Sequence, residues 1–331
     1  MAEIKKTFSF DSARLAARKD MLKAKFKDKK QVCISTGFQS LDDVLGGGLV
    51  DNIYIIGAES SVGKTALMTA IAKNAAKAGV NVLYFALEMT QAELYARGVS
   101  ALSFCTDKKV EYRDIVQGKA DWINVDALNA KYFEVYDKLY IIDEEDSYND
   151  GGFTAEDIYS IATDFAKKVP DERVMVVVDY LQYLKPAKSN MTEKQAADDA
   201  VSALKSLSSR MPVLAASSIA RCAYSKDVQK SSFKESGSIE YTGGYLIGYK
   251  WKGFTDTASA EERQKTLNQS MKDGFRKITL DILKARNGVI CTGDAGAHLK
   301  YYPAYDVFED DNSTTTKTSF NENSDNEMIV Y

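Results

Sequence analysis

The chain has 331 residues, of which 45% are hydrophobic and 27% are charged, proportions that are ordinary for a globular protein with a sizeable core. Its net charge of -4 argues against a surface that is basic all over, so any nucleic acid would have to use a local channel or loop. Four widely separated cysteines and a single histidine give no zinc-ligand spacing. The lack of a long apolar run predicts a cytoplasmic protein that does not cross a membrane.

The two ends of the chain differ in charge and in pattern. Residues 1–30 carry ten Lys or Arg and four acids, and Leu15, Leu22 and Phe26 form an apolar stripe on one side of a basic helix. We expect a helical N-terminal arm that packs either on its own domain or on a neighbouring subunit. Residues 306–331 carry seven acids and are rich in Asn, Ser and Thr, which predicts a disordered acidic tail.

Between these ends, short apolar runs alternate with helical patterns. The strands predicted in this way are 53–57, 80–87, 138–143, 173–181, 212–218, 244–250 and 277–285. An Ala-rich helix follows the first strand and ends at Gly79, whereas the polar segment 251–276 is expected to be an exposed excursion with a short helix at 259–271. The alternation predicts one α/β domain over residues 31–305, with a doubly wound, mostly parallel sheet flanked by helices.

The stretch GAESSVGKTA, residues 57–66, lies between the first predicted strand and the Ala-rich helix. It ends like a phosphate-binding loop, G-x-x-x-x-G-K-[ST], although Ala58 replaces the first glycine. In such a loop the backbone amides and the helix N-terminus bind phosphate, the lysine reaches the outer phosphates, and the following hydroxyl holds magnesium. The loop predicts a nucleotide site made by Ser60, Ser61, Val62, Gly63, Lys64, Thr65 and Ala66.

Two carboxylates follow predicted strands whose carboxyl ends should meet near this loop. Asp179 comes after four apolar residues, which is the pattern of the acid that orients a nucleotide-bound magnesium ion. Glu88 ends the second strand, at the sheet edge where ligands bind in open α/β folds. It is either a catalytic base or a solvated acid at the start of a helix.

Six motifs follow one another between residues 35 and 288. They are STGFQSLDDVLGGGL, GAESSVGKTA, FALEMTQAELYAR, VVVDYLQYL, KESGSIE and LKARNG. In this order they make the chain resemble the C-terminal motor domain of the DnaB family over about residues 32–305. These RecA-like P-loop ATPases assemble as hexameric replicative helicases, so the resemblance implies ATP and Mg2+ as cofactors and single-stranded DNA as the partner.

The resemblance also implies roles for residues of the ATP site. Asp179 would bind the metal, and Glu88 would be the catalytic base. Arg97 matches a family arginine near the nucleotide. Lys284 and Arg286 match a basic pair that reaches into the site of the next subunit, where an arginine finger stabilises charge in the transition state. ATP hydrolysis would then require an oligomer.

The DNA contacts implied by the resemblance lie in a loop that faces a central channel, at residues 221–237. Three residues match the family's phosphate-contacting positions, namely Lys234, Glu235 and Gly237. Further positive charge in the same loop comes from Arg221, Lys226 and Lys230. Contacts of this kind would make DNA binding tolerant of sequence and sensitive to salt.

The chain departs from the family pattern at several points. Ser218 and Ala220 stand where the strand that senses the γ-phosphate has glutamine and asparagine. About 30 residues replace the N-terminal domain that holds primase, which favours a minimal motor from a phage, plasmid or other mobile element, with primase or a helicase loader as candidate partners. Two other functions stay open: a filament-forming recombinase or clock-type ATPase, and a nucleotide-gated DNA-binding module with weak hydrolysis.

Overall fold

The computed structural model of the chain describes residues 33–59, 62–147, 152–170, 172–188, 190–219, 228–233, 239, 243–254, 259–286 and 288–312. The predicted arm at residues 1–30 and the tail beyond residue 312 lie outside these ranges. Within the ranges, no helix has both the length and the apolar character that are needed to span a bilayer.

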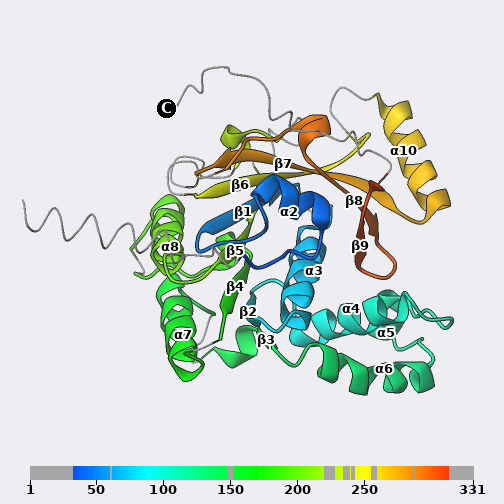
Figure 1. The fold of residues 1–331 in the computed structure, drawn as a ribbon, viewed down its shortest axis with the longest axis horizontal. Coiled ribbons are helices and arrows are strands. Elements are labelled where there is room, and N and C mark those ends of the chain that lie inside the picture. The colour runs from blue at the N-terminus through cyan, green and yellow to red at the C-terminus, as the bar shows by residue number, and fades with distance from the viewer. Residues whose placement is uncertain are drawn as a thin grey trace, which may run out of the picture.

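A nine-stranded sheet in the order β3-β2-β4-β5-β1-β6-β7-β8-β9 forms the centre of the molecule (Figure 1). Its strands are β1 Ile53–Ala58, β2 Asn81–Ala86, β3 Leu139–Ile142, β4 Val174–Asp179, β5 Val213–Ser218, β6 Tyr245–Trp251, β7 Arg276–Ala285, β8 Ala297–Tyr302 and β9 Val307–Asp310. The pairs from β3 to β6 are parallel, and those from β6 to β9 are antiparallel. The predicted α/β fold with a mostly parallel sheet is confirmed, as are the seven predicted strands.

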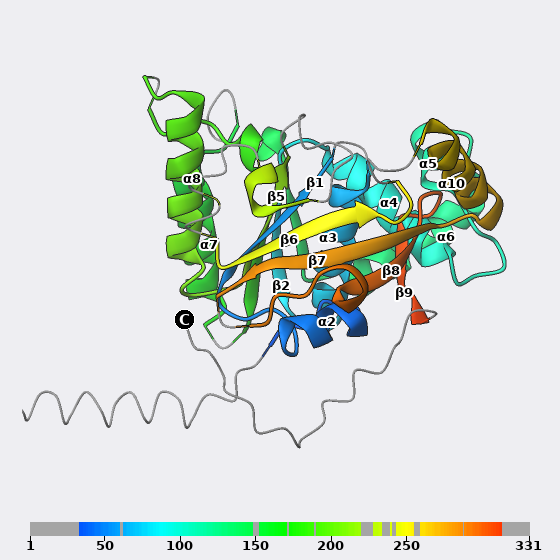
Figure 2. The same ribbon diagram turned by 90° about the horizontal axis from the view of Figure 1, so that it is seen from above.

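Helices cover both faces of this sheet because its central strands are apolar on both sides. On one face α2 (Gln39–Leu45) and α3 (Lys64–Lys77) pack on side chains such as Tyr54 and Ile56. On the other face α7 (Ala155–Lys168) and α8 (Glu193–Leu207) pack on their alternating neighbours, Ile53 and Ile55. Figure 2 shows the long strands β6 and β7 running between the end of the sheet at α8 and the end at α10.

Three helices between β2 and β3 form a small unit of their own beside the sheet, with α4 at Gln91–Ser103, α5 at Tyr112–Val116 and α6 at Trp122–Val135. They enclose a separate apolar cluster that includes Val99, Ile115 and Leu128. Helix α4 begins with a capping box between Thr90 and Glu93, in which side chain and backbone bond reciprocally. The unit brings one side of α4 to the edge of the sheet where β2 ends.

The polar excursion after β6 folds as predicted, with α10 at Ala260–Asp273 and no buried residue on it. Single turns of 3-10 helix lie at η1 Glu144–Asp146, η2 Leu181–Tyr183, η4 Lys230–Ser232 and η5 Gly293–Ala295.

The predicted boundary between domain and tail at residue 305 is wrong, because the sheet continues to residue 310. Phe308 of β9 is 7% exposed and packs edge-on against Phe38 and stacked on Tyr301. Asp310 looks like a solvated tail acid in the sequence, yet its two oxygens accept the backbone N-H groups of Gln39 and Ser40, at 2.9 and 3.0 Å, at the start of α2. The end of the domain thus caps a helix from its beginning.

We expect Phe308→Ala to lower the free energy of unfolding by about 3 kcal/mol, because it leaves a cavity against two aromatic rings. Glu309→Ala, at the exposed neighbouring position on β9, should change it by less than about 0.5 kcal/mol. Urea denaturation of both variants measures the difference. Wild-type stability in Phe308→Ala would show that β9 does not belong to the folded domain.

Candidate nucleotide site

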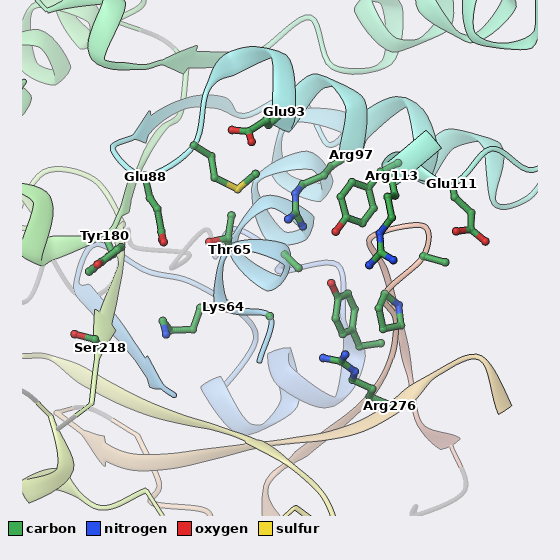
Figure 3. Close-up of a pocket in the computed structure, with 17 residues that line it drawn as sticks. Lys64, Thr65, Glu88, Glu93, Arg97, Glu111, Arg113, Tyr180, Ser218 and Arg276 are labelled. Carbon is green, nitrogen blue, oxygen red and sulfur yellow. The ribbon is translucent and has the colours of Figure 1, made fainter. Parts of the chain in front are cut away.

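A cavity of 630 Å³ opens where the carboxyl ends of β1, β2, β4 and β5 meet the N-terminus of α3 (Figure 3). Ligands bind at this edge in open α/β sheets. Residues from all parts of the domain line it, namely Gly63, Lys64, Thr65, Ala66, Glu88, Met89, Glu93, Arg97, Glu111, Tyr112, Arg113, Tyr180, Ser218, Arg276, Tyr301, Pro303 and Ala304. The cavity therefore brings together the loop lysine and threonine, Glu88 and Arg97, all of which the sequence singles out.

The end of the phosphate-binding loop has the expected form. Gly63 has a φ of 116° just before α3, and a Cβ atom there would lie 2.9 Å from the hydroxyl of Tyr249, so only glycine fits. Lys64 Nζ donates to the carbonyl oxygens of Ala58 and Glu59 at 3.0 and 2.8 Å. The ammonium is thus held across the loop, where it can reach a bound phosphate. Ser60 and Ser61 lie outside the described residues.

Burial lowers the pKa of the Lys64 ammonium, and the nearby carboxylates of Asp179 and Glu88 act in the opposite direction. A triphosphate at the loop would add negative charge on the same side. The electrostatic environment of Lys64 therefore suits an anionic ligand.

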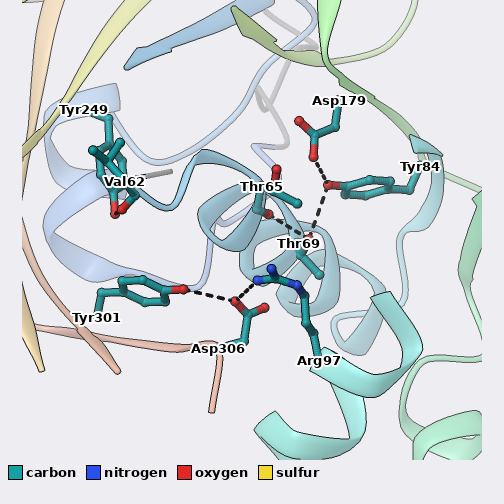
Figure 4. A network of polar contacts seen from close by, with 9 residues as sticks. All are labelled: Val62, Thr65, Thr69, Tyr84, Arg97, Asp179, Tyr249, Tyr301 and Asp306. Carbon is teal, nitrogen blue, oxygen red and sulfur yellow. Dashed lines mark hydrogen bonds and ion pairs between the residues drawn. The ribbon is translucent and has the colours of Figure 1, made fainter. Parts of the chain in front are cut away.

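Asp179 is 3% exposed at the end of β4, with its carboxylate next to the start of α3 (Figure 4). The Tyr84 hydroxyl donates to Oδ2 at 2.9 Å, and that hydroxyl lies 3.3 Å from Thr69 Oγ1. The other oxygen, Oδ1, makes no well-formed hydrogen bond within the described ranges. Burial raises the pKa of Asp179, although the Thr65 and Tyr84 hydroxyls and Lys64 oppose this. A buried carboxylate with an oxygen left over is suited to bind a cation.

Magnesium fits this arrangement because it prefers oxygen ligands and keeps several waters. Asp179 supplies a carboxylate and Thr65 a hydroxyl at the head of α3. In the part of the chain that the structure describes, no group of three or more His, Cys, Asp or Glu could hold a metal by itself. The donors present therefore suit a metal ion that arrives with a nucleotide and shares its phosphates.

Glu88 and Arg97 approach the cavity from the segment after β2. Glu88 is exposed, and its carboxylate points into the cavity opposite Tyr180 (Figure 3). Arg97 lies on α4, with its guanidinium over the ring of Tyr112 at 4.7 Å and paired with Asp306 at 2.7 Å. One acid open to water and one cation thus lie on the α4 side of the cavity.

The far end of the cavity contains residues that the sequence did not indicate. They are Tyr112, Arg113, Arg276, Tyr301, Pro303 and Ala304. The Arg276 guanidinium stacks over Trp251 at 4.4 Å, so its planar group is held in place. Rings, a proline and stacked guanidinium groups suit a flat ligand group such as a nucleotide base. No local motif marks these positions, since they come from α5, β7 and the turn after β8.

Lys284 and Arg286 do not line the cavity of their own chain. Arg276 does so at the start of β7, but Lys284 is eight residues further along the strand, which corresponds to about 27 Å. The backbone N-H of Arg286 donates to the Gly244 carbonyl at 2.9 Å, which fixes the strand end. If these two cations act on a nucleotide, it is one bound by another molecule.

The predicted DNA loop is described only in part. Lys230 is half-buried in η4. The other five predicted contacts lie outside the described residues, namely Arg221, Lys226, Lys234, Glu235 and Gly237.

Asp179→Asn should stabilise the protein in the absence of nucleotide and metal at neutral pH. An acid whose pKa is raised by folding stabilises the fold only while it is protonated, so its penalty is present at pH 7.5 and vanishes below its ordinary pKa of about 3.9. We expect the variant to melt above the wild type at pH 7.5, with the gap closing toward pH 4. Thermal unfolding followed by circular dichroism measures both, with Glu88→Gln as an exposed control. A lower melting temperature at pH 7.5 would show that the bond from Tyr84 outweighs burial.

Comparison with known proteins places this geometry in a family. The replicative DNA helicase DnaB of Helicobacter pylori (strain ATCC 700392 / 26695) is 26% identical over 253 residues, 73% of this chain and 48% of that helicase. The DnaB of Geobacillus stearothermophilus is 27% identical over 291 residues, 85% of this chain and 57% of that protein. The chain thus spans about half the length of these relatives.

Among solved structures, one whose title describes an ATPase domain has the same fold, with a TM-score of 0.69 at 23% identity, and the match covers 92% of this chain and 99% of that one. The family model described as DnaB-like helicase C terminal domain matches residues 33–310. The chain therefore belongs to the DnaB-like helicase C-terminal domain family.

Proposed function

We propose that the protein is an ATP-dependent DNA helicase or translocase that works as a ring, with ATP and Mg2+ bound in the cavity at the head of α3. The observation that carries the proposal is the convergence of Lys64, Thr65, Glu88 and Asp179 from three separate segments at one sheet edge. Membership of a helicase family supports the choice of reaction.

Each of these residues has one task in the proposed reaction. Lys64 and the loop amides bind the outer phosphates, while Thr65 and Asp179 hold the metal ion. Magnesium, when bound, neutralises charge that develops on the phosphate oxygens. Glu88 is exposed in the cavity, so a water molecule can reach its carboxylate and give up a proton as it attacks the γ-phosphate.

We expect Glu88→Gln to lower the rate of ATP hydrolysis at least about 100-fold, because the amide cannot accept the proton of the attacking water. The affinity for ATP should change little, since Glu88 makes no contact in binding. Glu93→Gln is the matched control: it removes another acid that lines the cavity, but an amide can keep the cap of α4. Phosphate release and equilibrium titration with ATP measure the two quantities. An unchanged rate would remove Glu88 from the reaction.

The position of Lys284 and Arg286 supports hydrolysis between subunits. They lie at the opposite end of β7 from the cavity, so in a ring they can meet the nucleotide of an adjacent copy. An arginine supplied in this way stabilises the charge of the transition state. Each cavity would then be complete only in the assembly.

Mixing two inactive variants tests this arrangement. Arg286→Ala keeps the loop and loses the finger, whereas Lys64→Ala loses the loop lysine and keeps the finger. We expect each alone to be nearly inactive, and an equal mixture to recover about a quarter of the wild-type rate, because a quarter of the interfaces would join two intact halves. The control mixture of Lys64→Ala with Glu88→Gln should stay inactive, since no interface in it carries both. Activity of Arg286→Ala alone would contradict a finger in trans.

An exposed apolar surface on the α4–α6 unit supports a contact between subunits. Four large side chains on it are 49–80% exposed, namely Val116, Trp122, Ile123 and Phe133. Acids such as Asp121 and Asp126 accompany them. The basic arm at residues 1–30, with its apolar stripe, complements this surface in charge and in hydrophobicity. We infer that the arm of one subunit binds this surface of the next.

The loop at residues 221–237 is the proposed contact with single-stranded DNA. Its cations would bind the phosphate backbone, so binding would be tolerant of sequence and weakened by salt. One related structure carries a title that names a DnaB-like replicative helicase and its interactions with primase. A primase or a loader therefore belongs to the same proposal as a candidate partner.

One residue favours a second function, a nucleotide-gated DNA-binding module with weak hydrolysis. Ser218 lines the cavity at the end of β5, where the family has a glutamine that senses the γ-phosphate. Its side chain is short and offers no amide. ATP turnover that DNA does not accelerate would favour this second function.

A further inference from the structure

A buried charged cluster lies behind the cavity and joins α3, α4 and the turn between β8 and β9. Arg97 Nη1 pairs with Asp306 Oδ1 at 2.7 Å, and the Tyr301 hydroxyl donates to the same oxygen at 3.4 Å (Figure 4). Asp306 is 1% exposed and has a φ of 55°, a conformation that Asp tolerates better than most residues. The turn is thus fixed with its carboxylate pointing inward.

A second cation in this cluster, Lys73, lacks a hydrogen-bond partner among the described residues. It lies on α3, nine residues after Lys64, and is 5% exposed. Asp306 Oδ2 and Arg97 Nε likewise make no hydrogen bond within the described ranges. Burial lowers the pKa of Lys73, Asp306 raises it and Arg97 lowers it. Two cations thus share one buried carboxylate, which is an unfavourable arrangement unless one of the cations can leave.

Arg97 is the cation that has somewhere to go, because its side chain also lines the nucleotide cavity. A phosphate offers a guanidinium group two oxygens in a matching geometry. If Arg97 turned toward a phosphate without any replacement, Asp306 would stay buried as an unpaired carboxylate, at a large energetic cost. Lys73, whose Nζ bonds to no other described residue, can supply the missing positive charge.

We propose that Arg97 exchanges partners when a nucleotide binds: it leaves Asp306 for a phosphate, and Lys73 then pairs with Asp306. Lys73 and Asp306 are positioning residues in this exchange, and neither touches the nucleotide. The exchange rests on the proposed ATP site and adds to it two residues that no motif marks. It also links occupancy of the cavity to the turn at residues 303–306, from which β9 and the end of the domain continue.

The exchange predicts opposite effects of Lys73→Met on stability and on binding. Without nucleotide, the variant should melt at a higher temperature than the wild type, because an apolar side chain replaces a buried ammonium that no described residue bonds. With Mg2+ and AMP-PNP, a non-hydrolysable ATP analogue, its dissociation constant should rise at least about tenfold, because Asp306 is left unpaired in the bound state. Lys77→Met, at an exposed position of the same helix, should change neither quantity.

A double variant separates the exchange from a structural role of Lys73. In an Asp306→Asn background, adding Lys73→Met should leave AMP-PNP affinity unchanged, because no carboxylate needs the lysine. Asp306→Asn alone should bind AMP-PNP at least as tightly as the wild type, since Arg97 is no longer held. Calorimetric titration and thermal unfolding of the full chain give all these values.

Several results would overturn the exchange. Wild-type affinity in Lys73→Met would do so, as would an equal loss of affinity in the Asp306→Asn background. Weaker binding by Asp306→Asn alone would show instead that Asp306 holds Arg97 in place for the nucleotide. Wild-type protein that binds AMP-PNP no better than Lys64→Ala would defeat the proposed function itself, and with it the exchange.

Discussion

The carboxylate of Asp179 is buried at the end of a central strand, and only one of its oxygens has a well-formed hydrogen bond among the described residues. Such a group destabilises the fold unless a cation completes it. The sheet order makes this possible, because β1 and β4 are separated only by β5, so the loop before α3 lies close to the end of β4. Thr65 and Lys64 then stand next to a carboxylate that needs positive charge, and a magnesium-bound phosphate satisfies all three.

The same constraint of charge recurs at a second place in the cavity wall. Arg97, Asp306 and Lys73 form a cluster with more positive than negative groups, on the opposite side of α3 from Asp179. One site has an unsatisfied anion and the other an excess of cations. A magnesium nucleotide carries both signs, and it would relieve both at once. Lys284 and Arg286, by contrast, lie along β7 beyond reach of this cavity, which is why a single chain offers only part of the proposed site.

Much of this was predictable from the sequence, because it depends on residues close together in the chain. Buried strands appear as uninterrupted apolar runs, and Lys64, Glu88 and Asp179 directly follow such runs or the loop after one. Tyr84 was not predictable, since a tyrosine within an apolar strand looks like any core residue. The pair of Arg97 and Asp306 joins positions 209 residues apart, and nothing local marks it. Strands β8 and β9 contain lysines, tyrosines and acids, and so they resemble surface segments until their partners are known.

The central claim is that ATP is hydrolysed between copies of this chain and that single-stranded DNA accelerates the reaction. The most direct measurement is the specific rate of ATP hydrolysis across a range of protein concentrations, with and without single-stranded DNA, on samples whose mass distribution is recorded by mass photometry. The account predicts a rate that rises with the oligomer fraction and rises further with DNA. A monomer that hydrolyses ATP at the full rate, indifferent to DNA, would contradict it.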